Sequence, residues 1–291
     1  MLKCRRSQLF LPSMAMKMAS LNSGSNANCY YIGNDHNALL IDTGLSCRET
    51  EKRLLRLGID IRSIDAVFIT HEHNDHVSGL PSLIKKYRLP VYLTKGTLTN
   101  LPVPVEKDQA CVISPGDKIP IGSLQVHTFT KHHDAAEPCS LLVSDGTHCI
   151  GVMTDIGHSC KEVKKHFSLC DAVFLESNYC EEMLRNSKYP ESLKKRIQGR
   201  DGHLSNDQAL ELFRKHRSKR LQHLILSHLS QNNNTHEIAR NTFANHLGST
   251  LLTIASRYKE SGLLSLSVQK NKKRSVTGPL GKFVSTQLKL F

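Results

Sequence analysis

Residues 71–76 read His-Glu-His-Asn-Asp-His, and this hexapeptide constrains the fold and the chemistry of the chain more than any other segment. The residues just before it, 66–70, are apolar and β-branched, which predicts a buried strand. Residues 77–87 space their apolar side chains as on one face of a helix. The hexapeptide is therefore expected in a strand-to-helix turn at the carboxyl end of a strand, where α/β sheets place their ligands.

The side chains of this turn indicate a metal site. Three imidazoles and the Asp75 carboxylate fall within six residues. They would make a poor core, but they are good ligands for a divalent ion such as zinc. The alternative is a polar loop that is rich in histidine by chance, which would explain two histidines better than four ligand groups.

The pattern His-x-His-x-Asp-His resembles the metallo-β-lactamase superfamily, and four further motifs occur in the order that this family shows. Each is an aspartate or a histidine at or after the end of an expected strand. They are Asp42, His133, Asp155 and His228. The resemblance covers roughly residues 17–268. It implies an α/β fold, a four-layer αββα sandwich in which two mixed sheets pack face to face with helices outside.

Several shorter segments resemble a narrower group, the YycJ (WalJ) branch of bacterial nucleases, which is related to the tRNA-processing enzyme RNase Z. These segments are residues 21–28, 133–135, 175–179, 189–190 and 202–206. The branch usually has an aspartate after the segment that contains Glu176, where this chain has Cys180. The departure concerns a supporting position and no metal ligand.

By this resemblance, seven side chains bind two divalent metal ions, zinc or manganese. They are His71, His73 and His133 for the first ion, Asp75, His76 and His228 for the second, and Asp155 as the bridge. Two such ions bring the pKa of water toward neutrality and stabilise the attacking and departing oxygens of a phosphodiester. Asp75 is also expected to orient the nucleophile. His132 is the rival of His133, since adjacent strand residues face opposite ways; the family's His-Asp-Ala pattern favours His133.

His203 and Glu176 are further candidates for catalysis. His203 precedes a helix start that the capping-box pair Ser205 and Gln208 predicts, and the free N–H groups of such a start favour anions. In RNase Z-like enzymes a histidine in this context protonates the leaving oxygen, with a glutamate equivalent to Glu176 nearby. A general acid is worth roughly 10²–10⁴-fold in rate. The alternatives are a surface-loop position for His203 and a lysine partner for Glu176.

Asp42 is expected behind the ligands, where it would orient a ligand histidine. A capping role in the turn at Gly44 is the alternative, and both can hold. The remaining histidines are expected to be structural or exposed. Among them His158 follows Asp155 closely, which makes it the one candidate for a place near the metals.

The formal net charge of +13 and the pI near 9.4 indicate a polyanionic partner, because basic surfaces bind nucleic acid largely by neutralising phosphates. Basic tails are the alternative source of this charge. The segment from Lys270 onward does contain lysines and an arginine but no acid. No window approaches the 18 apolar residues of a membrane span, so no membrane partner is expected.

The nine cysteines show no Cys-x-x-Cys spacing, which fits a reducing cytoplasm and argues against a disulfide framework. Those in or beside apolar runs are expected to be buried thiols. They are Cys29, Cys47, Cys139, Cys149 and Cys170.

Three regions are expected along the chain: an N-terminal extension over 1–16, expected to be disordered, a catalytic domain over 17–268, and a basic, flexible tail over 269–291. Apolar runs predict strands over 27–33, 38–42, 65–69, 90–94, 110–114, 123–130, 139–145, 148–154, 171–176, 221–227 and 263–268. Helical patterns cover 47–57, 76–87, 95–100, 159–167, 190–198, 206–216 and 235–247.

The last five residues, 287–291, resemble the pentapeptide with which bacterial proteins bind the sliding clamp. The expected anchors are Gln287, Leu288, Leu290 and Phe291. The three apolar side chains would fill a hydrophobic pocket of the clamp. A terminal strand, or a tail packed on its own domain, is the alternative.

The leading hypothesis is a metal-dependent phosphodiesterase acting on nucleic acid, more readily DNA than RNA, as an exonuclease in replication or repair. The alternative enzyme is a hydrolase of a small thioester or lactam, against which the positive charge and the His203 segment argue. The alternative without activity is a clamp-tethered DNA-binding adaptor with a structural metal. The seven ligands argue against the adaptor, because a structural zinc needs only four protein ligands, which close its coordination sphere.

Overall fold

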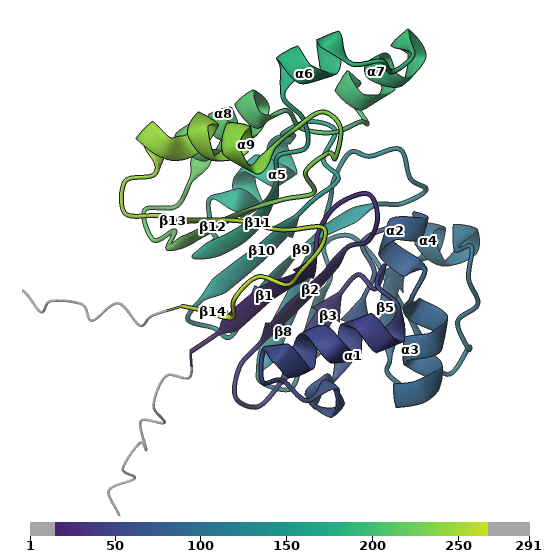
Figure 1. Ribbon diagram of the computed structural model, residues 1–291. Helices are drawn as coiled ribbons and strands as arrows, with labels where there is room; N and C mark the ends of the chain where they lie inside the picture. Colours follow the sequence, from purple (N-terminus) through teal and green to yellow (C-terminus); the bar gives the residue numbers. More distant parts are fainter. Residues whose placement is uncertain (1–14, 267–291) are drawn as a thin grey trace, which may run out of the picture.

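Two seven-stranded sheets face each other in the computed structural model, which describes residues 15–266 (Figure 1). Each sheet contains antiparallel and parallel pairs, and helices lie on the outer faces. This confirms the predicted four-layer α/β sandwich of two mixed sheets. Residues 1–14 of the extension expected over 1–16 lie outside the described residues, but Met16 is buried in the core, so the domain begins before residue 17. The tail expected over 269–291, with its clamp-like peptide, lies wholly outside the described residues.

The first sheet has the strand order β14-β1-β2-β3-β4-β5-β6. Its strands are β1 (Lys17–Asn22), β2 (Cys29–Gly33), β3 (Ala38–Ile41), β4 (Ala66–Phe68), β5 (Val91–Thr94), β6 (Ala110–Ile113) and β14 (Leu264–Ser265). Strands β3 to β6 are parallel, so their carboxyl ends share one edge of this sheet.

The second sheet has the order β13-β12-β11-β10-β9-β8-β7. Its strands are β7 (Lys118–Ile121), β8 (Leu124–Thr130), β9 (Cys139–Ser144), β10 (Cys149–Met153), β11 (Ala172–Glu176), β12 (His223–Ser227) and β13 (Leu251–Ile254). Strands β10 to β13 are parallel, and β8 shares their direction because β9 is antiparallel to both β8 and β10. These strands therefore deliver the residues that follow them to one edge.

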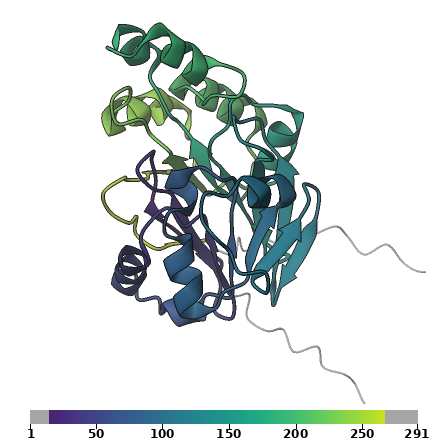
Figure 2. The same ribbon diagram turned by 90° about the vertical axis from the view of Figure 1, so that its right-hand side faces the viewer.

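The helices form the outer layers (Figures 1 and 2). Those beside the first sheet are α1 (Cys47–Arg56), α2 (Asn74–Val77), α3 (Leu80–Tyr87) and α4 (Lys95–Asn100), and those beside the second are α5 (Lys161–Phe167), α8 (Asn206–His216) and α9 (His236–Phe243). Two short 3₁₀ turns are η1 (Ile61–Ser63) and η2 (Ala244–His246). Helices α6 (Glu181–Asn186) and α7 (Glu191–Gln198) project from the end of the second sheet, and α7 buries none of its residues.

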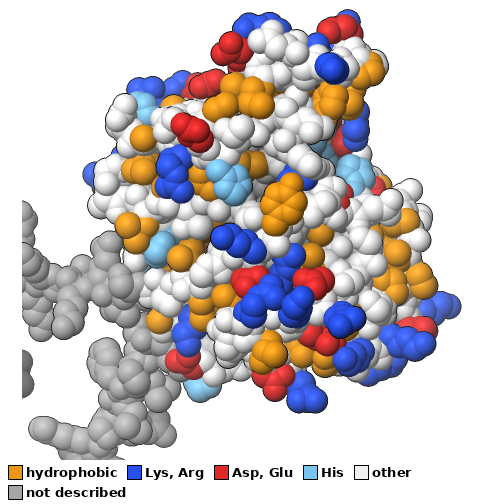
Figure 3. Space-filling view, in the orientation of Figure 1, with side chains coloured by type: hydrophobic (Ala, Val, Ile, Leu, Met, Phe, Trp, Pro, Cys, Tyr) orange, Lys and Arg blue, Asp and Glu red, His pale blue; other side chains and the backbone are white. Residues whose placement is uncertain are grey.

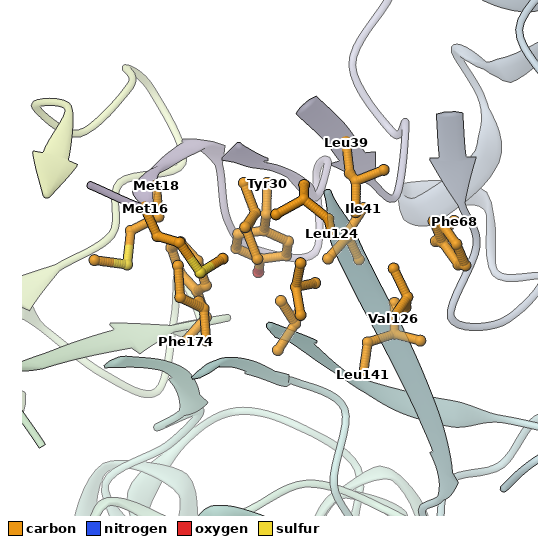
Figure 4. Packing of buried hydrophobic residues seen from close by; sticks show 14 of the residues in the cluster. Met16, Met18, Tyr30, Leu39, Ile41, Phe68, Leu124, Val126, Leu141 and Phe174 are labelled. Carbon is orange, nitrogen blue, oxygen red and sulfur yellow. The ribbon is translucent and has the colours of Figure 1, made fainter. Parts of the chain in front are cut away.

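Alternation along the strands builds the core. In β2, Tyr30 and Ile32 pack between the two sheets, whereas Cys29 and Tyr31 pack beneath the outer helices. Figure 4 shows the layer between the sheets, where the rings of Tyr30 and Phe174 lie 4.9 Å apart. Both faces of these strands are buried, which explains why the sequence shows continuous apolar runs rather than a strict polar alternation.

The sequence patterns missed strands β1, β7 and β13 and helix α6. Strand β7 contains Pro120 and lies at an edge of its sheet, where proline is tolerated although it weakens a strand pattern. Strand β13 forms the opposite edge and leaves Leu251 exposed. Edge strands bury fewer side chains, so their sequences carry less of the signal on which the prediction depends.

Some predicted boundaries also differ. The helix expected over 76–87 is two helices, α2 and α3, separated at Ser78 and Gly79. The helix expected over 235–247 ends at Phe243 and continues as a 3₁₀ turn. The strand expected over 263–268 is seen as β14, and its last two residues lie outside the described part.

Four of the five predicted buried thiols are buried, and the prediction for Cys149 is wrong. Cys149 begins β10, so it is half-buried and lies beside the buried Cys170. All eight cysteines of residues 15–266 are free thiols.

Gly79 is the point where the hexapeptide turn is pressed against the loop after β3. A Cβ on Gly79 would lie 1.7 Å from the carbonyl oxygen of Leu45 and 2.8 Å from that of Thr43. The Gly79 N–H donates to the same Thr43 oxygen at 2.9 Å. Only glycine allows this approach, which holds α2 and the hexapeptide in place.

We expect Gly79→Ala to lower the free energy of unfolding by about 1–3 kcal/mol, because backbone must move to relieve the overlap. Thermal unfolding followed by circular dichroism measures the loss. Gly262→Ala is the matched control, since nothing lies within 4 Å of a Cβ there. Equal melting temperatures for the two variants would contradict the close approach at Gly79.

Candidate metal centre

The seven predicted ligands converge at the carboxyl ends of strands from both sheets. The turn after β4 supplies four of them, and the segments after β8, β10 and β12 supply one each. They are His71, His73, Asp75 and His76, then His133, Asp155 and His228. The surface is hollowed between the part that contains α6 and α7 and the part that contains α2 and α4, and histidine side chains are visible there (Figure 3).

The ligand atoms form overlapping groups, two of which match the predicted division between two ions, and a group of His71, His76 and Asp155 connects these two. His71, His73 and His133 place a nitrogen each within 4.8 Å of the others. In the first group, His71 Nε2 lies 3.1 Å from His73 Nδ1. Three other side chains form the second group, in which each places one ligand atom within 4.8 Å of the others. These are Asp75, His76 and His228.

Asp155 lies between the two groups. Its Oδ2 is 3.3 Å from His76 Nε2, and its Oδ1 is 3.3 Å from His228 Nε2. The same Oδ1 is 3.8 Å from His133 Nε2, which belongs to the other group. One carboxylate thus faces both groups, which is the arrangement that a bridging ligand needs.

Backbone conformation at the strand ends helps to aim these side chains. Asp42, Asp155 and His228 have φ values of 59°, 54° and 56°. Residues other than glycine rarely adopt this left-handed conformation, and such strain concentrates at functional sites. Each strand end therefore turns sharply toward the centre instead of continuing the sheet.

Unsatisfied polar atoms show that the residues fit a metal ion. His133 Nε2 and Asp155 Oδ2 are among the buried side-chain atoms that have no hydrogen-bond partner within the described residues, and both belong to predicted ligands. Buried polar atoms without a partner are rare because they are costly. Imidazole nitrogens and carboxylate oxygens form the donor set that zinc and manganese take, so bound ions would satisfy both atoms.

The carboxylates and imidazoles at the centre change one another's pKa. Burial disfavours the charged form of His76, but the carboxylates of Asp42, Asp75 and Asp155 outweigh burial and raise its pKa to about 10. For His133 burial prevails and lowers the pKa to about 4. His133 is therefore neutral at pH 7, the form of imidazole that binds a metal ion, whereas His76 would release a proton on binding one.

Asp42 holds the ring of His76 from behind. Asp42 Oδ2 lies 2.8 Å from His76 Nδ1, which leaves Nε2 to face the centre. Asp42 also accepts hydrogen bonds from the backbone N–H of Thr70 at 2.8 Å and from its hydroxyl at 3.0 Å. The side chain is thus directed at the hexapeptide rather than at the turn of Gly44.

Two amide side chains to which the sequence patterns gave no role also support the centre. Asn28 Nδ2 donates to Asp75 Oδ2 at 3.0 Å and lies 3.0 Å from His76 Nε2. Asn178 Nδ2 lies 3.1 Å from His228 Nδ1. Both asparagines fall in segments that carry the YycJ resemblance, 21–28 and 175–179. Their place in these segments was the one sequence signal that could have indicated a role at the centre.

His203 and Glu176 form a pair beside the centre. His203 Nδ1 lies 2.7 Å from Glu176 Oε1, and the His203 ring stacks on that of His228 at 5.3 Å. Glu176 is fully buried, and its Oε2 accepts the N–H of Ile156 at 2.6 Å. Burial would raise the pKa of Glu176, but His203 and then His228 outweigh burial and lower the pKa to about 2. His203 is thus half-buried against a carboxylate, and the capping box that follows it is present.

His132 and His158 lie apart from the ligand groups that the described residues form. Their rings are 4.3 Å from each other. His132 Nδ1 is 3.5 Å from Asp201, and His158 Nδ1 is 3.0 Å from the Arg200 carbonyl. His133, and not His132, belongs to the centre.

Comparisons with known proteins agree with this fold and site. Residues 37–228 match the family described as the β-lactamase superfamily domain. The exodeoxyribonuclease YycJ of Bacillus anthracis is 35% identical over 230 residues, 78% of this chain and 87% of that protein. The exodeoxyribonuclease WalJ of Streptococcus pneumoniae is 28% identical over 254 residues, 86% of this chain and 94% of that protein.

Among solved structures, the metallo-β-lactamase fold protein YhfI from Bacillus subtilis superposes with a TM-score of 0.68 at 17% identity, covering 86% of this chain and 99% of that one. That similarity supports the fold alone. Together, fold, site and sequence define a hydrolase of the metallo-β-lactamase superfamily. Within it, this chain belongs to the family of YycJ and WalJ. Among residues 15–266, no helix is long and apolar enough to cross a membrane.

Proposed function

We propose that the protein is a phosphodiesterase that uses two divalent metal ions to hydrolyse nucleic acid, and that it acts on DNA as a cytoplasmic exonuclease in replication or repair. The observation that carries this proposal is the pair of ligand groups that share Asp155, next to the pair of His203 and Glu176. The exonuclease activity in the names of YycJ and WalJ supports the DNA substrate.

The residues of the two groups would hold the ions. His71, His73 and His133 would bind one, the group of Asp75 would bind the other, and Asp155 would contact both. When bound, zinc or manganese ions polarise phosphoryl oxygens and lower the pKa of water. Asp42 and the two supporting asparagines would keep the ligands oriented, as partners behind ligands do in metal sites.

The protein's own side chains would move the protons. Asp75, held by Asn28, would help to orient the attacking water. His203 would donate a proton to the departing oxygen, since an alkoxide is a poor leaving group. Glu176 would position the His203 ring through the 2.7 Å contact. The net charge of +13 would attract the polyanionic substrate.

Digestion of end-labelled DNA and RNA, single- and double-stranded, with Mn²⁺ or Zn²⁺ tests the proposal. Release of nucleotides from one end of DNA is expected. A thioester and a lactam substrate are assayed in parallel. Hydrolysis of the thioester or lactam but not of nucleic acid would favour the small-substrate hydrolase. Absence of every assayed activity in the metal-loaded protein would favour the DNA-binding adaptor.

We expect two metal equivalents per chain in the purified protein, measured by inductively coupled plasma mass spectrometry. Removing them with a chelator should abolish hydrolysis, and adding Zn²⁺ or Mn²⁺ should restore it, because the ions supply several kcal/mol of charge stabilisation. Circular dichroism of the metal-free protein checks that the fold survives. Full activity with a single equivalent would contradict the dinuclear site.

The proposed partner of the C-terminal segment is the sliding clamp. Gln287, Leu288, Leu290 and Phe291 lie outside the described residues, so the proposal rests on the sequence pattern alone. Removing 287–291 should abolish clamp binding while sparing hydrolysis of short oligonucleotides, because a tether raises local concentration without altering the site. Calorimetry of the tail peptide with the clamp measures the affinity directly. No heat at high micromolar peptide, with no competition, would count against a clamp partner.

A further inference from the structure

A cavity of about 160 Å³ lies beside the candidate metal centre and plays no part in the chemistry proposed above. Three segments line it: the residue after β1, Ser23; the turn between β12 and α9; and the chain after β13, which contains Arg257. One water needs only ~10–15 Å³ of such space, so the cavity has room for a phosphate group. The segments after β12 and β13 lie on the face shown in Figures 1 and 3.

The cavity is basic. None of the residues that line it is acidic, whereas Arg257 is a cation. Arg257 donates to the Leu229 carbonyl at 2.9 Å and to Gln231 Oε1 at 3.0 Å, and it forms no ion pair with a carboxylate of residues 15–266. Burial lowers the pKa of Arg257. The positive charge of a half-buried arginine is not balanced when all of its hydrogen-bond partners are neutral. A bound anion would balance that charge.

The N-terminus of α9 adds to the positive electrostatic potential of the cavity. Thr235 caps the helix by accepting the N–H of Ile238 at 3.0 Å. His236, the first residue of the helix, lines the cavity. Burial and then the charges of Arg240 and Arg257 lower the pKa of His236, so several positive charges surround it. Helix starts favour anions because their N–H groups and the helix dipole are positive.

The cavity and the metal centre share a turn of the chain. The N–H of His228, a candidate ligand, donates to the hydroxyl of Ser23 at 2.7 Å, and Ser23 lines the cavity. Leu229 and Ser230, which follow His228, line it as well. An anion in the cavity would therefore lie close to the substrate atoms at the centre.

We propose that this cavity binds a second phosphate group of the nucleic-acid strand whose scissile phosphate lies at the metal centre, with Arg257 as its main contact; this inference rests on the proposed function. Arginine suits the task because its planar fork of donors matches a phosphate. Two phosphates of a strand have the required chemistry, a terminal monophosphate and an internal phosphodiester. The substrate's end group distinguishes them.

The test compares Arg257→Gln with Arg214→Gln, an equal loss of charge on α8 beside a cavity that contains Asp207 and Glu211. Binding of fluorescent single-stranded DNA is measured by anisotropy in chelator, so that no cleavage occurs. Arg257→Gln should weaken binding about 10- to 100-fold, the value of a hydrogen bond to a charged group. It should also reduce the slope of log K against log salt by about 0.7. Arg214→Gln should change neither.

Turnover separates this role from a structural one. With metal present, Arg257→Gln should raise KM for oligonucleotides, while hydrolysis of bis(4-nitrophenyl) phosphate, which has one phosphate, should change far less. Oligonucleotides with a 5′-phosphate and a 5′-hydroxyl are compared. A loss confined to the phosphorylated one assigns the terminal group, and equal losses assign an internal phosphate.

Unchanged binding and KM in Arg257→Gln would overturn the phosphate cavity. A parallel loss with bis(4-nitrophenyl) phosphate would overturn it too, because Arg257 would then only brace the turn after His228. If the wild-type protein cleaves neither DNA nor RNA, the proposed function fails instead. The anisotropy comparison distinguishes these failures, since it needs no turnover.

Discussion

Asp75→Ala should reduce DNA hydrolysis by on the order of 10²–10³-fold while the protein stays folded. Asp75 is one of the three side chains of the second ligand group, and its Oδ2 lies 3.5 Å from His228 Nε2 and 3.4 Å from His76 Nε2. Its loss should remove or misplace one ion, and a metal ion contributes several kcal/mol to such a reaction. Turnover, metal content and circular dichroism are measured on the same preparation.

Two carboxylate-to-amide substitutions, one at a predicted ligand and one beside it, test the assignment of Asp75 more sharply. Asp75→Asn keeps the size of the side chain but removes its charge, and Glu72→Gln makes the same change elsewhere in the hexapeptide, at a carboxylate outside both ligand groups. Glu72 Oε1 accepts the N–H of Ala136 at 2.7 Å, and glutamine retains an acceptor there. Asp75→Asn should resemble Asp75→Ala, and Glu72→Gln should resemble the wild type. Wild-type turnover in both Asp75 variants would overturn the ligand assignment.

His203→Ala should lower turnover of DNA by roughly 10²–10⁴-fold, the usual value of a general acid, with little change in metal content. The loss should be much smaller with bis(4-nitrophenyl) phosphate, because nitrophenolate departs without a proton. Both substrates are assayed at saturating metal, and metal content is determined for each preparation.

His158→Ala is the matched control for this variant, since His158 contacts the Arg200 carbonyl and lies outside the ligand groups. It should leave the ratio of the two activities unchanged. Equal losses on both substrates in His203→Ala would remove the general-acid role. Lost metal would instead assign His203 to the ligands, since it also falls in a group with Asp155, Glu176 and His228.

The fold and the clustering of the seven candidate ligands were predictable because their signals are local. Each expected ligand follows an apolar strand, and strands with a common direction bring such residues to one edge. The structure places Asp155 between the two ligand groups and Asp42 against His76. The roles of these residues in metal binding and catalysis remain predictions.

The supporting shell was not predictable in the same way. Asn28 and Asn178 are amides in loops, where asparagine is common for reasons of turn geometry. Arg257 meets Ser23 and His236 only in the folded chain, because these residues lie in segments that are distant in sequence. Tertiary contacts of this kind leave no periodic pattern in the sequence from which they could be predicted.

The central claim is that two metal ions lie at this centre, and anomalous X-ray scattering from crystals grown with Zn²⁺ or Mn²⁺ tests it most directly. Two peaks are expected, one among His71, His73 and His133 and one in the group of Asp75, with Asp155 between them. A single peak among Asp155, Glu176 and the two histidines near them, or no peak at either ligand group, would contradict the account.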